Sequence, residues 1–159
     1  MTDQLTKYFE DFAESSIQRM KSALLGIRYY ERIRARLAKK EDLSGELPII
    51  AKVGPVGTME VVKEAIADYK KQLAGAWNIH PRLQEIGKFK CVLTTNDREQ
   101  IPRAELKYEF KSSAGTVKIR ITSAGETYSV EINAGKNPMA AQLARRELEK
   151  NLTFIALTT

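Results

Sequence analysis

The sequence predicts an α+β protein, with an N-terminal helical hairpin followed by an antiparallel four-stranded meander that a C-terminal helix covers. Residues 3 to about 40 contain no proline and carry apolar residues at roughly helical spacing. Three segments of the C-terminal half alternate apolar and polar residues, and short glycine-containing turns join them. Helical spacing in one half and strand alternation in the other predict a fold whose helices and strands are segregated along the chain.

The helical region is predicted over residues 1–78. Its first part forms one long helix, or two helices that break near Ser15-Ser16 or at Gly26. Residues 47–53 are predicted as an edge strand or an extended arm, and Thr58 then caps a second helix. An apolar stripe should pack this second helix against the first; its members recur every three or four residues and are Met59, Val62, Ile66, Tyr69 and Leu73.

The second region, residues 79–159, is predicted to contain the sheet and the last helix. Strands are expected at residues 88–95, 104–111, 116–123 and 127–133, with one apolar face and one solvent-exposed face. A helix over residues 138–152 should cover the apolar face through Ala140, Leu143, Ala144, Leu148 and Leu152. Residues 154–157 are a candidate final strand. The two regions can form separate domains or share one core.

Composition limits the classes of function. The chain has 159 residues, with 26 Lys and Arg against 20 Asp and Glu, and this excess of positive charge favours polyanionic partners. One cysteine and one histidine can form neither an internal disulfide nor a Cys/His metal site. No apolar run approaches the roughly 20 residues of a membrane span, and acidic residues occur early in the N-terminus, unlike a signal peptide. We therefore expect a cytoplasmic protein without membrane contact.

The first candidate site is the basic run in the first helix. Because a helix turns about 100° per residue, four of its cations share a face, namely Arg28, Arg32, Arg36 and Lys39. Such a row can follow a phosphate backbone with salt-dependent affinity. The alternative is a solvated helix face, or cations that complement the negative end of the helix dipole. Tyr29 and Tyr30 are expected to pack and not to stack on bases.

A second candidate site lies at the start of the last helix. Lys136 precedes free backbone N–H groups and the positive end of the dipole, and Arg145 and Arg146 follow about two turns later. The alternative is a capped helix with ordinary surface cations. Lys118 and Arg120, on the solvent-exposed sheet face, are further candidates for phosphate contact.

Residues 104–152 resemble a known family. Three antiparallel strands, then Gly135-Lys136, then the basic helix containing Ala140 to Leu148, are similar to the double-stranded-RNA-binding domain. In that family the N-terminus of the last helix docks on phosphates and recognises the shape of the duplex more than its sequence. The resemblance implies RNA as the partner, in preference to DNA.

No set of residues predicts catalysis, since no nucleophile, metal site or acid–base pair can be assembled. The leading hypothesis is a non-enzymatic nucleic-acid (RNA) binding protein without cofactor, an accessory subunit of a ribonucleoprotein assembly. The alternative is a protein-interaction module, such as a virion or assembly component or an inhibitor that docks on a larger enzyme. In that case the N-terminal helix would present its apolar stripe to a protein partner or to a second copy of the chain.

Overall fold

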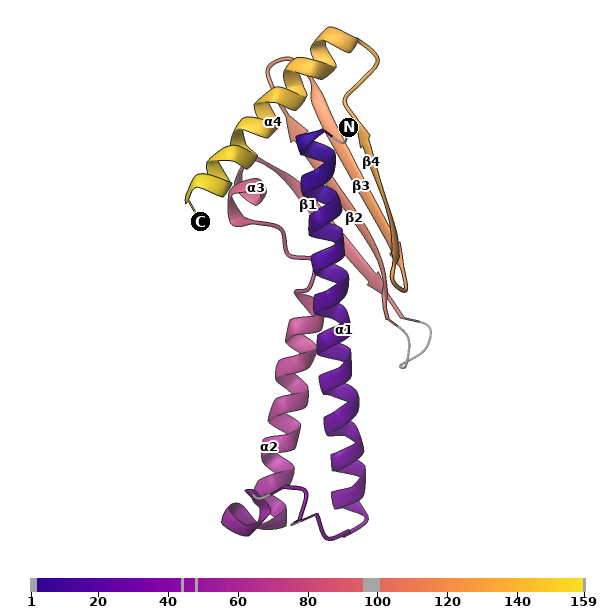
Figure 1. The fold of residues 1–159 in the computed structure, drawn as a ribbon, viewed down its shortest axis with the longest axis vertical. Coiled ribbons are helices and arrows are strands. Elements are labelled where there is room, and N and C mark those ends of the chain that lie inside the picture. The colour runs from indigo at the N-terminus through magenta and orange to yellow at the C-terminus, as the bar shows by residue number, and fades with distance from the viewer. Residues whose placement is uncertain (1–2, 44, 48, 96–100, 159) are drawn as a thin grey trace. The chain divides into compact units, whose positions relative to one another are not determined.

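A computed structural model describes residues 3–43, 45–47, 49–95 and 101–158. It confirms the predicted α+β class, with N-terminal helices, a four-stranded antiparallel sheet and a C-terminal helix (Figure 1). The elements are α1 (Gln4–Ala38), α2 (Ile49–Ala74), α3 (Pro81–Ile86), β1 (Gly87–Thr94), β2 (Arg103–Lys111), β3 (Thr116–Ala124), β4 (Thr127–Asn133) and α4 (Pro138–Thr158). Among the described residues, no helix combines the length and apolar character that a membrane span requires.

The chain divides into two compact units. The sheet unit comprises Met1–Ile17 and Trp77–Thr159, and the hairpin unit comprises Gln18–Ala76. The units differ from the predicted regions 1–78 and 79–159 in one respect: the first seventeen residues group with the sheet. The long first helix is a single helix, without a break at Ser15-Ser16 or Gly26, and it contributes residues to both units.

The sheet has the strand order β1-β2-β3-β4, and all three pairings are antiparallel. Burial alternates along every strand, as the predicted two-faced meander requires. The buried face packs against the first turns of α1 and against α4 (Figure 1). Leu5 and Phe9 of α1 are fully buried, and the Phe9 ring lies 6.2 Å from the ring of Tyr108 on β2. Helices therefore cover one face, and the other face remains exposed.

Two polar contacts join α1 to later parts of the sheet unit. Asp3 caps α1 by accepting a hydrogen bond from the Thr6 N–H (2.7 Å), and it also pairs with Arg145 of α4 (3.3 Å). The Tyr128 hydroxyl of β4 donates a hydrogen bond to Glu14 (2.8 Å), and this bond raises the pKa of Tyr128 to about 12. Segments more than 100 residues apart in the sequence are thus held together at the surface of the unit.

The junction of α3 and β1 is closely packed. The buried Tyr108 hydroxyl donates to the backbone carbonyl of Leu83, at 2.7 Å. A Cβ atom at Gly87 would lie 2.5 Å from the Tyr108 hydroxyl oxygen and 2.7 Å from the backbone oxygen of Glu109. Only glycine therefore fits where β1 leaves α3.

The predicted end of the last helix is wrong. Residues 154–157 do not form a strand, because α4 continues to Thr158. Ile155 extends the buried stripe of Ala144, Leu148 and Leu152 by one more turn, and helical packing therefore outweighs the strand propensity of the short apolar run. Leu143, predicted in the covering stripe, is 48% exposed.

The hairpin unit contains its own small core. Ile33 and Leu43 pack with Val62 and Ile66 of α2, as the predicted helix–helix stripe requires. The rings of Tyr30 and Tyr69 stack beside this cluster, with centroids 6.0 Å apart. Tyr30 is therefore a packing residue, as predicted, whereas Tyr29 is 52% exposed and packs only edge-on against the Tyr30 ring.

The start of α2 differs from the prediction. The residues from Ile49 to Val53 are helical and not an extended arm, whereas Pro48 lies outside the described residues. Gly54 has φ 77 and breaks the helical geometry inside α2. Thr58 is not a cap, since its hydroxyl donates back to the Gly54 carbonyl (2.8 Å) one turn earlier. Gly54 therefore marks a kink within α2.

Candidate functional site

The exposed face of the sheet carries the densest group of cations in the sheet unit. Lys and Arg occupy seven of its outward positions, against three carboxylates; the cations are Lys88, Lys90, Arg103, Lys107, Lys111, Lys118 and Arg120. The carboxylates are Glu105, Glu109 and Glu131. This face therefore carries a net positive charge on a rigid scaffold of paired strands.

Register places three of these cations in one row. Lys90 of β1 is paired with Lys107 of β2, and Lys107 is paired with Arg120 of β3. Neighbouring strands lie about 4.8 Å apart, so the row crosses roughly 10 Å of the surface. Like charges directly opposite each other on neighbouring strands are destabilising. A bound anion would relieve this repulsion.

One carboxylate offsets part of the repulsion in the cationic row. Glu105 lies 3.6 Å from the Lys107 ammonium and 3.4 Å from the Arg120 guanidinium. Both pairs are exposed, so each contributes little to stability. Among the described residues, Lys90 has no carboxylate within ion-pair distance. Glu131 of β4 lies opposite Arg120 at the other end of the row. Three cations thus have two carboxylates beside them, and the row keeps a net positive charge.

A second row runs beside the first. It places Lys88 opposite Glu109 and Glu109 opposite Lys118. An open groove lies along both rows, and its lining includes both cations and carboxylates: Lys88, Lys90, Lys107, Glu109, Lys118, Arg120 and Glu131. We call the two rows together the cationic groove.

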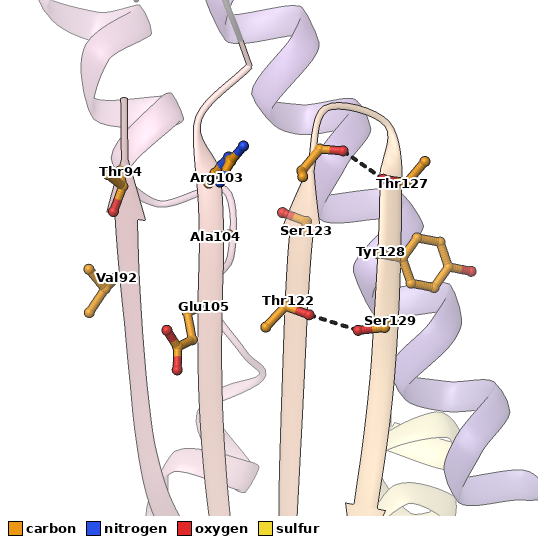
Figure 2. Close-up of a pocket in the computed structure, with 11 residues that line it drawn as sticks. Val92, Thr94, Arg103, Ala104, Glu105, Thr122, Ser123, Thr127, Tyr128 and Ser129 are labelled. Carbon is orange, nitrogen blue, oxygen red and sulfur yellow. Dashed lines mark hydrogen bonds between the residues drawn. The ribbon is translucent and has the colours of Figure 1, made fainter. Parts of the chain in front are cut away.

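The other end of the exposed face is rich in hydroxyl groups and carries one cation and one carboxylate, Arg103 and Glu105 (Figure 2). The Thr122 and Ser129 hydroxyls lie 2.7 Å apart in a hydrogen bond, and Thr127 donates to the Ala124 carbonyl at 2.8 Å. Val92 and Thr94 project from β1, and Arg103 and Glu105 of β2 lie between them and these hydroxyl groups. These groups add neutral hydrogen-bonding capacity next to the cationic groove.

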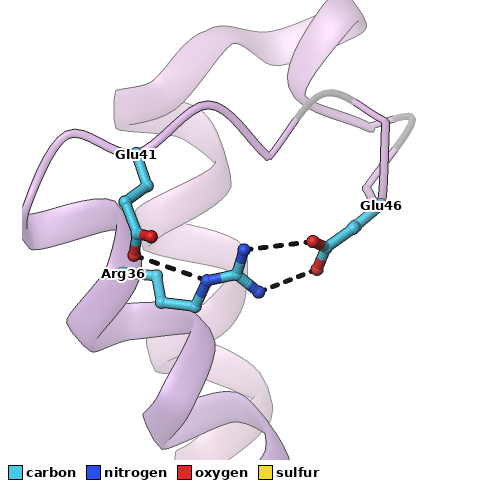
Figure 3. A network of polar contacts seen from close by, with 3 residues as sticks. All are labelled: Arg36, Glu41 and Glu46. Carbon is cyan, nitrogen blue, oxygen red and sulfur yellow. Dashed lines mark hydrogen bonds and ion pairs between the residues drawn. The ribbon is translucent and has the colours of Figure 1, made fainter.

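The predicted row on the first helix is not a uniform set of available cations. Arg36 pairs with Glu46 through two hydrogen bonds (2.8 and 3.0 Å) and with Glu41 at 3.4 Å (Figure 3). Arg28 is half-buried, and its Nε is buried without a hydrogen-bond partner among the described residues. Arg32 and Lys39 are exposed. Arg36 therefore acts in the connection between α1 and α2, while Arg32 and Lys39 remain candidates for anion contact.

The start of α4 carries its own cap. The side-chain oxygen of Asn137 accepts hydrogen bonds from the N–H groups of Met139 (3.0 Å) and Ala140 (3.3 Å). Arg145 is held by Asp3, whereas Lys136 and Arg146 are exposed. The cap occupies donors that the predicted anion site needs, which favours the alternative of a capped helix with surface cations.

The remaining polar candidates have structural contacts. The ring Nδ1 of His80 accepts a hydrogen bond from the Arg82 N–H (3.0 Å) and caps α3. Cys91 is half-buried, and burial raises the pKa of its thiol to about 11. Within the described ranges, no cluster of three or more His, Cys, Asp and Glu residues could hold a metal ion.

The structure thus groups Lys118 and Arg120 with three lysines that were not predicted as site residues, Lys88, Lys90 and Lys107. Alternation alone placed all three lysines on the exposed face. Their alignment with Arg120 and Lys118 depends on strand register. Comparisons with protein-family models, with curated proteins and with solved structures find no match for this chain.

Proposed function

We propose that the protein binds the phosphate backbone of nucleic acid, with the cationic groove of the sheet as its contact surface. The observation that carries this proposal is the row of Lys90, Lys107 and Arg120 on three adjacent strands. The three aligned cations outnumber the two carboxylates beside them, Glu105 and Glu131. A row with this excess of positive charge can follow a line of phosphates.

The groove has cations that can contact the phosphate backbone of a nucleic acid, and it lacks aromatic side chains that could contact bases. The outward positions of the four strands carry no aromatic side chain on which a base could stack. Sheets that bind single strands use such aromatic platforms. A duplex, with its phosphates outside and its bases inside, is therefore the better partner. The resemblance to the double-stranded-RNA-binding domain makes duplex RNA the first ligand to test, and a place in a ribonucleoprotein assembly follows from that.

The test is fluorescence anisotropy with a labelled 20-base-pair RNA duplex over a range of salt concentrations. We expect tight binding at low salt, with affinity that falls steeply as salt rises. Lys90→Gln, Lys107→Gln and Arg120→Gln combined should lower affinity tenfold or more. The variant should also reduce the slope of log K against log salt by about 2 to 3, because about 0.9 is lost per phosphate contact.

A matched control separates the effect of losing the cationic groove from the effect of lowering the net charge of the protein. Arg32→Gln, Arg34→Gln and Lys39→Gln combined also remove three positive charges, from two exposed positions near the end of α1 and from the residue that follows the helix. This control should retain most of the affinity. Equal losses in the two triple variants, or no low-salt affinity of the wild type for RNA or DNA, would overturn the proposal.

A gain of affinity is expected from the opposite change. Glu105→Gln removes the carboxylate that competes with phosphate for Lys107 and Arg120. We expect affinity for the RNA duplex to rise several-fold at low salt, and the effect to fade at high salt as screening increases. Glu85→Gln is the control, because Glu85 pairs with Arg82 in α3, outside the sheet. Unchanged or lower affinity of Glu105→Gln would contradict the proposed site.

A further inference from the structure

The outer face of α4 carries a second surface that the proposed function does not use. A surface helix normally presents polar residues to solvent. Here four large apolar side chains are exposed: Met139 (74%), Leu143 (48%), Phe154 (54%) and Leu157 (81%). At 100° per residue they form one stripe, on the side opposite the buried residues Ala144, Leu148, Leu152 and Ile155. The helix is thus apolar on two opposite faces.

Cations interrupt the middle of this stripe. Arg146 and Lys150 are exposed and lie on the same side of the helix, between Leu143 and Phe154. From α3, the Arg82 guanidinium lies 5.5 Å from the centre of the Phe154 ring and donates a hydrogen bond to Asn151 (3.3 Å). These contacts hold the exposed ring in place. We call Met139, Leu143, Arg146, Lys150, Phe154 and Leu157 the α4 stripe.

The α4 stripe contains no carboxylate of its own. The two acids of α4, Glu147 and Glu149, lie to its sides and are half-buried, and Glu147 accepts a hydrogen bond from Ser113 (3.0 Å). An occupant must therefore supply apolar groups at both ends and negative charge in the middle. From Met139 to Leu157 the stripe is about 27 Å long, the length of a helix of five turns.

We infer that the α4 stripe is the docking site for an acidic amphipathic helix of a partner protein. Charge complementarity selects this occupant, since central carboxylates would meet Arg146 and Lys150 while apolar residues cover Leu143 and Phe154. A second copy fits less well, because two-fold pairing would bring the same cations against each other. A lipid surface fits less well, because the cations lie in the middle of the apolar stripe and not along its margins.

The test uses two synthetic 20-residue helical peptides with the same leucine face. One carries glutamates at the central positions and the other carries lysines there. We expect the acidic peptide to bind with micromolar affinity and to shift the NMR signals of Leu143, Arg146, Phe154 and Leu157. The basic peptide should bind at least tenfold more weakly.

A charge-swapped variant provides the decisive control. Arg146→Glu with Lys150→Glu should exchange the preference, so that the basic peptide binds and the acidic peptide does not. The triple sheet variant of Lys90, Lys107 and Arg120 should bind the acidic peptide like the wild type, which separates this surface from the cationic groove. Failure of the nucleic-acid proposal would leave this result unaffected.

Three outcomes would overturn the inference. The first is the absence of shifts on α4 with acidic peptide at millimolar concentration. The second is binding of the wild type to vesicles of phosphatidylserine and phosphatidylcholine that Leu143→Ser with Leu157→Ser abolishes. The third is a dimer in sedimentation that the same double variant converts to monomer, because the occupant would then be a second copy.

Discussion

Individual charged residues in this chain have different roles, and their partners distinguish them. Arg36 and Arg120 are both arginines on exposed surfaces near carboxylates. Arg36 holds Glu46 through two hydrogen bonds and Glu41 through a third contact, so its five donors are largely occupied. Arg120 makes one ion pair, with Glu105, which it shares with Lys107, and it lies opposite Glu131 on β4. The first arginine fixes a connection, and the second retains donors for a ligand.

The Arg36–Glu46 pair predicts a pH dependence. Hydrogen bonds from Arg36, and then its charge, hold the pKa of the Glu46 carboxyl below its usual range. A depressed folded-state pKa contributes stability that is present above the unfolded pKa, about 4.3, and is lost as pH falls through the folded value. In Arg36→Gln, the pKa of Glu46 should rise toward its usual range, which carboxyl NMR titration can measure. The free energy of unfolding should then fall less steeply with decreasing pH below about 4.

Arg32→Gln is the control for this prediction, because Arg32 is exposed on the same helix and Glu46 is not among its contacts. Its Glu46 pKa should match that of the wild type. Arg36→Gln should also leave affinity for the RNA duplex nearly unchanged, since its donors already serve the carboxylates. A normal Glu46 pKa in the wild type, or a large loss of RNA affinity in Arg36→Gln, would contradict the structural role of Arg36.

At the scale of elements, the close packing of α3 against the sheet limits which side chains are tolerated at their junction. Gly87→Ala should lower the free energy of unfolding by about 2 kcal/mol or more, because the added methyl overlaps the Tyr108 hydroxyl and the Glu109 backbone oxygen. It would also disturb the buried hydrogen bond from Tyr108 to Leu83. Urea unfolding measures the two effects together, as one change in the free energy of unfolding.

Gly115→Ala is the matched control in the same unit, since a Cβ there meets no atom within 4 Å. Its unfolding free energy should stay within about 0.5 kcal/mol of the wild type, or rise slightly through the stiffer unfolded chain. Similar stability of the two variants would show that the junction between α3 and β1 is less tightly packed than the structure indicates.

Elements were predictable from sequence where local pattern and tertiary packing agree. The meander follows from clean alternation and short turns at Gly115 and Gly125, and Gly125 has φ 60, a value that favours glycine. The apolar run from Phe154 to Leu157, taken without its neighbours, predicts a strand where α4 in fact continues. Ile155, three residues after Leu152, continues the helical stripe, so the correct signal was present in the spacing.

Register explains why the candidate site was only partly predictable. Lys118 and Arg120 were assigned to the exposed face from alternation within one strand. Their alignment with Lys88, Lys90 and Lys107 requires the pairing of β1 with β2, and a one-residue slip would move every side chain to the other face. The segment that joins those two strands has no turn motif that sets this pairing. The sequence alone therefore predicts that these cations are exposed, but it does not predict that they form a row.

At the scale of the whole molecule, the stability of a segment depends on the core in which it packs and not on the helix to which it belongs. α1 is one continuous helix, yet its residues up to Ile17 and those from Gln18 onward belong to different compact units. Most of the largest fully buried side chains lie in the sheet unit, such as Trp77, Tyr108, Phe9 and Leu106. The hairpin unit buries the smaller cluster around Ile33, Leu43, Val62 and Ile66. Burial of apolar side chains therefore stabilises the sheet unit more than the hairpin unit.

This difference between the two cores predicts that the protection of backbone amides from hydrogen exchange changes along α1. In native-state hydrogen exchange, amides of α1 from Phe9 to Ile17, beyond the first turn, should open only with those of β2 and β3, at the highest free energy in the chain. Amides from Arg28 to Leu37 should exchange through a separate opening at lower free energy, together with those of α2. Strands β2 and β3 serve as the internal reference, because they lie in the middle of the sheet. Uniform protection from Phe9 to Leu37 would instead show that α1 opens as one unit, with helix continuity outweighing the difference between the two cores.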